Sequence, residues 1–468
     1  MKTGKSTFAL FFGNRSFFPS SMIADARREL AEVLRGLGHD VLLLDEGVTR
    51  HGAVETVTEG DVYARFLYDN KGKFDGVVLS LPNFGDETGA VAALQNAGVP
   101  IFIQAYPDEL DKMGPALRRD SFCGKLSIMD VFAQYRVPFT TCQPHTVGPR
   151  SAAFQQNIDY FDRVCRVTGG TRGLRVGALG ARTTPFKTVR YDEVALQRHG
   201  ITVETLDLAD IFKRMNAVDL NGRESEATNA RLEDYARWDG VPAKARENLV
   251  RLGVTMDAVI AEMSLGALAI RCWTELQQNY GISPCVLTSA LMERLVPAAC
   301  EVDVANAVTM HALGLASGEP TSILDWNNNY GDEPDKCVLF HCGNVPASLM
   351  LERGRVTDHS ILDKVLGAGC GYGCNQGRIR PFPFTYGSML TSEGKLRFYL
   401  GEGRFTEDPL PEDFFGCAGV AEIPRLQDVL QTIGHAGQRH HVSLTPGTFK
   451  KPMLEAFRTY LGYDVTEF

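Results

Sequence analysis

Three side chains that can bind a metal ion or transfer a proton follow short apolar runs between residues 297 and 346. Glu301 follows Pro-Ala-Ala-Cys, Asp325 follows Ser-Ile-Leu, and His341 follows Val-Leu-Phe. A carboxylate at the end of a buried strand is costly unless another group compensates its charge. One divalent cation shared by all three is the simplest compensating group. The alternative interpretation is that each is an ordinary strand-end or helix-capping residue.

Two adjacent histidines near the C-terminus could complete this set. His440 and His441 precede a strand-like Val-Ser-Leu run, and successive side chains of a strand point to opposite faces, so at most one should face a shared site. Two carboxylates with imidazoles suit Mn²⁺ or a similar ion. Such an ion can hold two adjacent oxygens of a polyol, while the carboxylates move a proton between neighbouring carbons. Asp303 is expected to be a first-turn helix acid that points elsewhere.

A cationic loop and two tryptophans are the next candidates for contact with a substrate. Arg182, Lys187 and Arg190 fall within nine residues. They are either a solvated surface loop or a rim that binds an anionic or strongly hydrogen-bonding group. Trp273 and Trp326 are the tryptophans nearest the acidic residues, and they are either core residues or a wall against a sugar.

Two glycine-rich motifs are weaker signals. Gly177-x-x-Gly180 follows a predicted strand but lacks the Gly-x-Gly-x-x-Gly pattern and acidic partner of a dinucleotide site. The run from Gly369 to Cys374 has a cysteine spacing unusual for zinc, with only Cys417 as a plausible third ligand. We therefore interpret this run as a turn.

Composition limits the class of protein. The chain has 468 residues, of which 44% are hydrophobic and 22% charged, as in ordinary globular proteins. A net charge of −9 gives no general attraction for nucleic acid. The eleven cysteines are scattered, mostly in apolar runs, which favours reduced thiols and a cytoplasmic location. No signal peptide and no membrane span are predicted, and we expect no membrane partner.

Strands alternate with helices in the first part of the chain. Buried-strand patterns occur at 7–12, 40–45, 75–80 and 99–104. This alternation predicts a parallel sheet with function in the loops after its strands. Arg15 lies in the first of these loops.

The rest of the chain predicts a second α/β unit and then a β-rich region. A second alternation begins near residue 174, and we assign a strand to residues 257–263 within it. After residue 318, short β-like runs alternate with Gly and Pro turns, which is typical of a barrel or sandwich. The predicted fold is α/β, with two Rossmann-like doubly wound domains at 1–147 and 148–317 and a barrel-like β-rich domain at 318–468.

Several of these segments resemble the L-fucose isomerase family, with a similar layout in L-arabinose isomerases. The resemblance is carried by Ala299-Cys300-Glu301-x-Asp303-Val304, Asp325, His440-x-Val442, Cys272-Trp273 and Gly13-Asn14-Arg15. It covers essentially the whole chain and is strongest from about 260 to 345.

The resemblance implies an Mn²⁺-dependent isomerase that interconverts aldoses and ketoses through an enediol, with Mg²⁺ or Co²⁺ as other possible ions. Glu301 and Asp325 would be metal ligands and the two acid/base groups. His440 would be the third protein ligand, because the valine two positions later fixes the register. His341 matches an arabinose-isomerase ligand and is either a fourth ligand or a hydrogen-bond partner of a ligand.

The resemblance also implies contacts with the sugar and an assembly. Arg15 matches a substrate-contacting position of a domain that reaches a neighbouring subunit's site, which implies a homo-oligomer, a trimer or hexamer. Asn327 and His441, beside the expected ligands, are further candidates for substrate contact. Val302 departs from the family pattern, which usually has glycine after the glutamate.

The substrate and one alternative function stay open. The sugar could be like L-fucose, D-arabinose or L-arabinose, or it could carry a sulfonate or phosphate bound by Arg182, Lys187 and Arg190. A non-catalytic cytoplasmic sugar-binding or regulatory protein on the same scaffold is the alternative.

Overall fold

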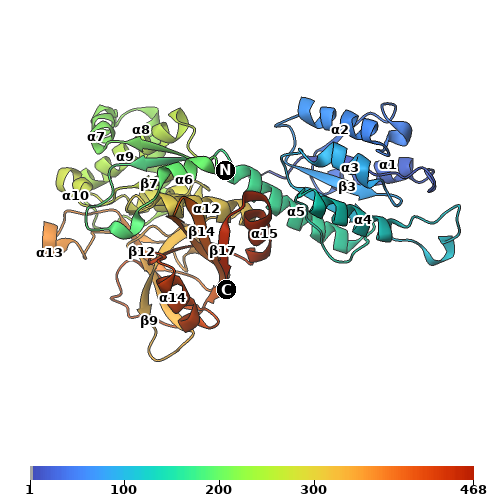
Figure 1. The fold of residues 1–468 in the computed structure, drawn as a ribbon. Helices are drawn as coiled ribbons and strands as arrows, with labels where there is room; N and C mark the ends of the chain where they lie inside the picture. The colour runs from blue at the N-terminus through green and yellow to red at the C-terminus, as the bar shows by residue number, and fades with distance from the viewer. Residues whose placement is uncertain (1–3) are drawn as a thin grey trace. The chain divides into compact units, whose positions relative to one another are not determined.

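A computed structural model describes residues 4–468 of the chain, in two compact units (Figure 1). The smaller unit contains residues up to Gly169 and then Pro452–Gly462, and the larger contains Gly170–Lys451 and Tyr463–Phe468. Within the described range, no helix is both long and apolar enough to cross a membrane. All eleven cysteines are free thiols.

The smaller unit is built on a four-stranded parallel sheet in the order β2-β1-β3-β4. Its strands are β1 (Phe8–Phe12), β2 (Val41–Leu43), β3 (Gly76–Leu81) and β4 (Ile101–Ala105). Its helices are α1 (Ile23–Gly36), α2 (Val57–Asp69), α3 (Glu87–Leu94), α4 (Ser121–Gln134) and most of α5 (Ala152–Thr171) and α15 (Lys450–Glu455). The short 3₁₀ turns η1 (Arg50–Gly52) and η2 (Leu110–Lys112) and the π-helical segment η5 (Ala456–Leu461) complete it. All four strands match runs predicted from the sequence.

Strand β1 shows why an uninterrupted apolar run forms a central strand. Phe8, Leu10 and Phe12 pack into one hydrophobic cluster, and Ala9 and Phe11 pack into another. Because alternate side chains point to opposite faces, both faces of this sheet are covered.

The larger unit contains a second four-stranded parallel sheet, in the order β6-β5-β7-β8. Its strands are β5 (Arg175–Leu179), β6 (Thr202–Leu206), β7 (Ala267–Ile270) and β8 (Ala298–Ala299). The helices of this part are α6 (Glu193–Arg198), α7 (Leu208–Ala217), α8 (Arg223–Tyr235), α9 (Ala243–Glu262), α10 (Glu275–Tyr280), α11 (Cys285–Glu293) and α12 (Val304–Ser317), with the turn η3 (Lys187–Val189).

The strand predicted at 257–263 is wrong, because these residues end helix α9 and the strand follows as β7. Val259, at the centre of the apolar run, is fully buried on the same helix as Leu252 and Met256. These residues stand three or four apart, so they form one face of a helix. A short apolar run alone does not distinguish this pattern from a strand.

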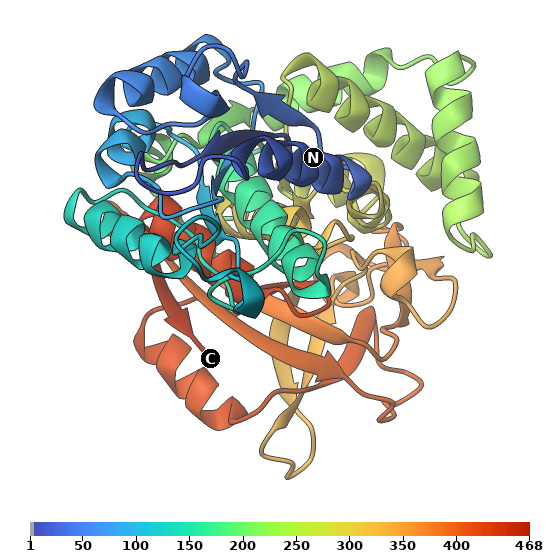
Figure 2. The same cartoon turned by 90° about the vertical axis from the view of Figure 1, so that its right-hand side faces the viewer.

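The β-rich region forms one mixed sheet of nine strands in the order β11-β12-β15-β10-β9-β16-β13-β14-β17 (Figure 2). Its strands are β9 (Ser322–Asn329), β10 (Lys336–His341), β11 (Arg355–Thr357), β12 (Cys374–Arg378), β13 (Pro383–Ser392), β14 (Lys395–Phe405), β15 (Cys417–Glu422), β16 (His441–Pro446) and β17 (Asp464–Glu467). The turn η4 (Ala347–Leu349) and the helices α13 (Asp363–Leu366) and α14 (Leu426–His435) complete it. Because β14 also pairs with β15, strands β15, β10, β9, β16, β13 and β14 pair in a closed circuit.

Helix α12 connects the two sheets of the larger unit. It contacts β5, β7 and β8 of the parallel sheet and β9, β13 and β16 of the mixed sheet. Every residue from Val304 to Ala316 is buried. A helix that is apolar on all sides must be enclosed, and here the two sheets enclose it. The mixed α/β architecture is thus as expected, whereas the division into three domains stays a prediction.

Candidate active site

Three neighbouring strands of the mixed sheet bring candidate residues together at one end. His441 of β16 stands opposite Asp325 of β9, and Asp325 also stands opposite Phe340 of β10, directly before His341. Residues directly opposite each other in an antiparallel pair have adjacent side chains. Strand pairing therefore assembles three groups that lie up to 116 residues apart in the sequence.

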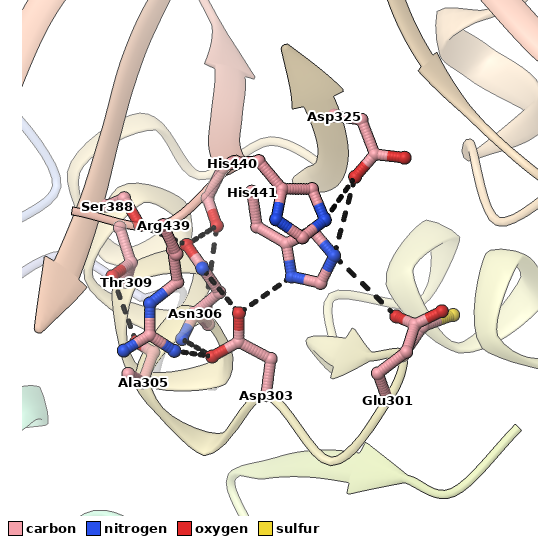
Figure 3. A network of polar contacts seen from close by, with 12 residues as sticks. Glu301, Asp303, Ala305, Asn306, Thr309, Asp325, Ser388, Arg439, His440 and His441 are labelled. Carbon is pink, nitrogen blue, oxygen red and sulfur yellow. Dashed lines mark hydrogen bonds and ion pairs between the residues drawn. The ribbon is translucent and has the colours of Figure 1, made fainter. Parts of the chain in front are cut away.

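Glu301 reaches the same place from the parallel sheet, just after β8. Glu301 and Val302 both have left-handed backbone conformations, with φ of 56° and 61°. A β-branched residue with positive φ is strained, and such strain is found where surrounding structure holds a functional turn in place. This turn directs the Glu301 side chain towards His441 of β16 and the neighbouring Asp325 of β9 (Figure 3). Glycine at position 302, usual in the resembling family, would relieve the strain.

The converging atoms form a compact set of nitrogen and oxygen donors. Oε2 of Glu301 lies 3.7 Å from His341 Nε2 and 3.8 Å from His441 Nε2. Oδ1 of Asp325 lies 3.4 Å from His441 Nε2 and 3.5 Å from His440 Nε2. His441 thus faces both carboxylates, and it is 1% exposed, whereas the side chain of His440 is 42% exposed.

This set fits a divalent cation. Donors that each bond one ion at about 2.1 Å stand roughly 3 to 4 Å apart, which matches the distances of His441 Nε2 from Glu301 and from Asp325. His441 is shared by two donor groups, Glu301–His341–His441 and Asp325–His440–His441. Oε2 of Glu301 and Oδ1 of Asp325 are buried atoms with no hydrogen-bond donor among the described residues. A buried carboxylate oxygen without a partner is costly, and a cation would compensate it.

The two ring nitrogens of His441 have different partners. Nδ1 lies 2.8 Å from Oδ2 of Asp303, which can only accept, so Nδ1 carries the proton. In the neutral ring, Nε2 then presents its lone pair towards Glu301 and Asp325. A histidine whose other nitrogen donates to a carboxylate is a common arrangement at metal sites.

Asp303 is held by four hydrogen bonds (Figure 3). Its Oδ1 accepts from the backbone N–H of Asn306 at 3.1 Å and from Arg439 Nη1 at 2.5 Å. Its Oδ2 accepts from Asn306 Nδ2 at 2.7 Å and from His441. Asn306 is fixed in turn by hydroxyl groups of Ser388 and Ser443. Both oxygens of this fully buried carboxylate are therefore satisfied, and Asp303 also caps helix α12.

His341 has the opposite arrangement from His441. The backbone N–H of Cys342 donates to His341 Nδ1 at 2.9 Å, so Nδ1 is the acceptor. The proton of the neutral ring then lies on Nε2 and faces Glu301. Its Nε2 proton points at Glu301 Oε2 from 3.7 Å, which is too far for a hydrogen bond, and a protonated Nε2 makes His341 a poorer metal ligand than His441.

Charges at the site follow from these contacts. Burial alone would raise the pKa of Glu301, but contact with His341 and His441 outweighs it and lowers the pKa to about 2. Burial lowers the pKa of His441, but Asp303 and the neighbouring Asp325 outweigh it and raise the pKa. Burial and the nearby His441 lower the pKa of His440. Glu301 is therefore ionised, and His440 neutral, at neutral pH.

A cavity of about 280 Å³ opens beside these groups. Its polar lining includes Glu301, Asp325, His341 and His440. Trp273 lines it too, and its Nε1 donates to Glu301 Oε1 at 3.3 Å. The other lining residues, none of which was assigned to the site from the sequence, are mostly apolar or thiol groups: Phe186, Cys272, Cys285, Cys300, Cys342, Ile361 and Leu362, together with Ser283 and His359. This volume is near the lower end for ligand pockets and suits a small metabolite.

Two of the other candidates lie outside this lining. Trp326 packs against the core of the mixed sheet, donating to the Tyr399 hydroxyl at 3.2 Å. Asn327 is exposed and, with Trp326, lines a separate hollow.

The cationic loop lies beside the cavity through Phe186. Lys187 and Arg190 are exposed, and Arg182 donates to carbonyl groups of its own loop. Arg15 belongs to the smaller unit, where its guanidinium contacts Glu87 and lies over the Phe84 ring.

Sequence reasoning missed Asp303 and Arg439 as parts of the site. Asp303 was assigned to a helix turn that points elsewhere, whereas it is the cap before the helix and contacts His441. Its position two residues after Glu301 was the only signal available. Arg439, beside the two histidines, is buried and paired with Asp303, a contact that bridges 136 residues.

Comparison with known proteins identifies the family. Residues 9–172 match the model "Fucose/sulfoquinovose isomerase, N-terminal domain", and residues 339–468 match "L-fucose isomerase, C-terminal domain". Together the two models cover more than half of the chain.

Curated relatives match along most of the chain. A sulfoquinovose isomerase of Alkalicoccus urumqiensis is 25% identical over 412 residues, 87% of this chain and 89% of that protein. One of Priestia aryabhattai is 24% identical over 421 residues, 86% of this chain and 88% of that protein. A solute-binding protein of Burkholderia multivorans, 12% identical over 68% of this chain and 95% of its own, has a TM-score of 0.18, too low to support any conclusion. The two domain models and these relatives show that the chain belongs to the L-fucose isomerase-like family of sugar isomerases.

Proposed function

We propose that this protein is an Mn²⁺-dependent aldose–ketose isomerase that acts on an open-chain sugar carrying a sulfonate. The observation that carries the proposal is the pair of buried, unpartnered carboxylate oxygens, Glu301 Oε2 and Asp325 Oδ1, on either side of His441 Nε2. The relatives named sulfoquinovose isomerases support the sulfonated sugar.

In this proposal Glu301, Asp325 and His441 hold the ion, and His440 contacts the sugar. The sequence resemblance favoured His440 as the third ligand. His441 is the better candidate because it is buried, its Nδ1 proton is fixed by Asp303, and its Nε2 faces both carboxylates. Mn²⁺ or a similar ion held there would supply a Lewis acid that stabilises negative charge on the sugar oxygens.

The protein's own groups move the proton. Glu301 is ionised and buried, so it can accept a proton from the carbon next to the sugar carbonyl. Glu301 can then return that proton to the neighbouring carbon, while Asp325, on the other side of His441, can take the proton of the C2 hydroxyl and pass it to the carbonyl oxygen. Trp273 orients Glu301 by donating to Oε1.

The cationic loop supplies the contact with the anionic group in this proposal. Phe186 lines the cavity, and Lys187 follows it directly with an exposed side chain. A flexible ammonium group there can reach a sulfonate at the cavity mouth. The chain is proposed to form a homo-oligomer in which Arg15 contacts the sugar in a neighbouring copy's site. A non-catalytic sugar-binding protein is not favoured, because sugar binding alone requires no buried, unpartnered carboxylate pair.

The first prediction tests the proton transfer. In D₂O with Mn²⁺, the wild-type protein should exchange the C2 proton of sulfoquinovose and form the ketose, as followed by NMR. Glu301→Gln should slow this exchange at least about 100-fold, because an amide cannot accept the proton. Exchange at the wild-type rate in this variant would refute its role, and no exchange with any aldose in the wild type would refute the proposed reaction.

The second prediction concerns the support of His441. Asp303→Asn keeps the side-chain size but replaces an acceptor by a donor, so Nδ1 of His441 is no longer held as a donor. Mn²⁺ affinity, measured by electron paramagnetic resonance of free ion, should fall roughly 10- to 100-fold. Asp207→Asn, which alters the cap of α7 only, is the control and should bind Mn²⁺ normally. Unchanged affinity in Asp303→Asn would contradict the proposed support of His441 by Asp303.

The third prediction concerns pH. The pKa of His441 is raised in the absence of metal, so its proton competes with the ion as pH falls through that pKa. Mn²⁺ affinity should therefore be full above this pKa and weaken below it, by up to about tenfold per pH unit. The same titration repeated with His441→Gln should lose this slope, whereas a slope that persists would assign it to another group.

The fourth prediction concerns the sulfonate. Lys187→Gln should lower kcat/KM for sulfoquinovose at least about tenfold, since a direct charge-assisted contact contributes roughly 1.5–3 kcal/mol. Turnover of a neutral aldose such as L-fucose should change little. Lys213→Gln, an exposed lysine on α7, is the matched control. An equal loss on both sugars would contradict a sulfonate contact.

A further inference from the structure

A second pocket of the larger unit is lined by arginines and lies apart from the residues of the candidate active site. Its volume is about 480 Å³, and its charged lining consists of Arg237, Arg353, Arg355, Arg378, Glu352 and Glu412. Four positive charges against two negative ones converge there, in a chain whose net charge is −9.

The backbone fixes two of these arginines side by side. Arg237 and Arg355 form a parallel bridge, in which the Arg237 amide donates to Gly354 and its carbonyl accepts from Val356, both at 2.8 Å. Arg355 in turn stands opposite Gln376 in the β11–β12 pair. This bridge and the β11–β12 pairing place Arg237 and Arg355 next to each other on the backbone that lines the pocket.

None of the four guanidinium groups has a carboxylate oxygen within 4 Å among residues 4–468. Arg353 donates to the carbonyl of Ala236, and Arg378 donates to the carbonyls of Gly377 and Pro411. Carbonyl acceptors position a guanidinium but leave its charge uncompensated. Neighbouring guanidiniums repel each other, and an oxyanion that accepts from several of them removes that repulsion.

The pocket is connected to the active-site cavity through one loop. Strands β11 and β12, which carry Arg355 and Arg378, are joined by residues 358–373. This loop contributes His359, Ile361 and Leu362 to the lining of the active-site cavity. A ligand held by both arginines therefore holds the two strands from which the loop extends.

We propose that the arginine-lined pocket binds a small molecule with two or more phosphate or sulfonate groups, and that binding holds the 358–373 loop against the active-site cavity. Oxyanion groups would bridge Arg237 and Arg355 on one side and Arg378 on the other. The binding site does not depend on the proposed isomerase activity, because sugar and metal play no part in it.

Calorimetry on the Mn²⁺-loaded protein tests the binding. The probe is meta-benzenedisulfonate, whose sulfonates do not withdraw the metal. One molecule should bind per chain, more weakly as NaCl is raised. Arg237→Gln and Arg355→Gln should each weaken binding at least tenfold, whereas the exposed Arg425→Gln on the N-terminal side of α14 should not. No binding, or equal binding by all four proteins, would overturn the proposal.

One control separates this pocket from the active site. Lys187→Gln should bind the probe as the wild type does, since Lys187 does not line the arginine-lined pocket. Loss of binding in Lys187→Gln but not in the arginine variants would place the probe in the active-site cavity and overturn the proposal. Because no sugar is present in the calorimetry, absence of probe binding would not contradict the proposed isomerase reaction. Absence of isomerase activity would likewise not contradict probe binding.

Two further measurements use the wild-type protein, so they do not require that any variant folds. The probe should protect Arg237 and Arg355 from phenylglyoxal, as read by peptide mass mapping, and unprotected arginines would overturn the proposal. Cys370 reports on the loop, because it lies within it and is partly exposed. Its alkylation should slow severalfold in the saturated protein, and an unchanged rate would refute the effect on the loop.

Discussion

The carboxylate of Asp303 is the interaction on which the candidate site depends. It is fully buried, pairs with the buried Arg439, caps helix α12 and holds the Nδ1 proton of His441. Removing one member of a buried ion pair costs roughly 3–5 kcal/mol, because the other charge stays buried without compensation. The position of a helix, the state of a histidine and part of the stability of the larger unit therefore rest on one side chain.

His341 and His441 show how the hydrogen-bond partner of the imidazole Nδ1 atom determines what the Nε2 atom can do. Both are buried, and both have Nε2 within 3.8 Å of Glu301 Oε2. Nδ1 of His341 accepts a hydrogen bond from a backbone N–H, whereas Nδ1 of His441 donates one to the carboxylate of Asp303. The same side chain thus presents a proton to Glu301 in one case and a lone pair in the other. Neither role depends on distance to the carboxylate, since the two distances are nearly equal.

Much of this architecture could be predicted because buried parallel strands leave long apolar runs. β1, β3 and β4 are such runs, and the alternation of helices between them indicates the sheet. The strand predicted at 257–263 was wrong because the buried face of helix α9 has the same apolar composition as a strand. The sequence also could not show which of His440 and His441 is the better metal-ligand candidate. Alternation shows that only one of them faces inward, but Asp303, which distinguishes them, lies 138 residues away from His441 in the sequence.

The complete enclosure of α12 has a consequence for how proteins of this architecture can diverge. Each residue of a helix adds about 100° of rotation, so a single insertion in α12 would turn its buried faces away from both sheets and separate Asp303 from His441. Insertions within α12 would therefore disrupt the packing of both sheets. The loops that bring Phe186, Ile361 and Leu362 to the cavity lie outside this enclosure and can change length freely. Descendants of such a chain can therefore exchange one sugar for another by rebuilding two loops while the proton-transfer chemistry is inherited intact.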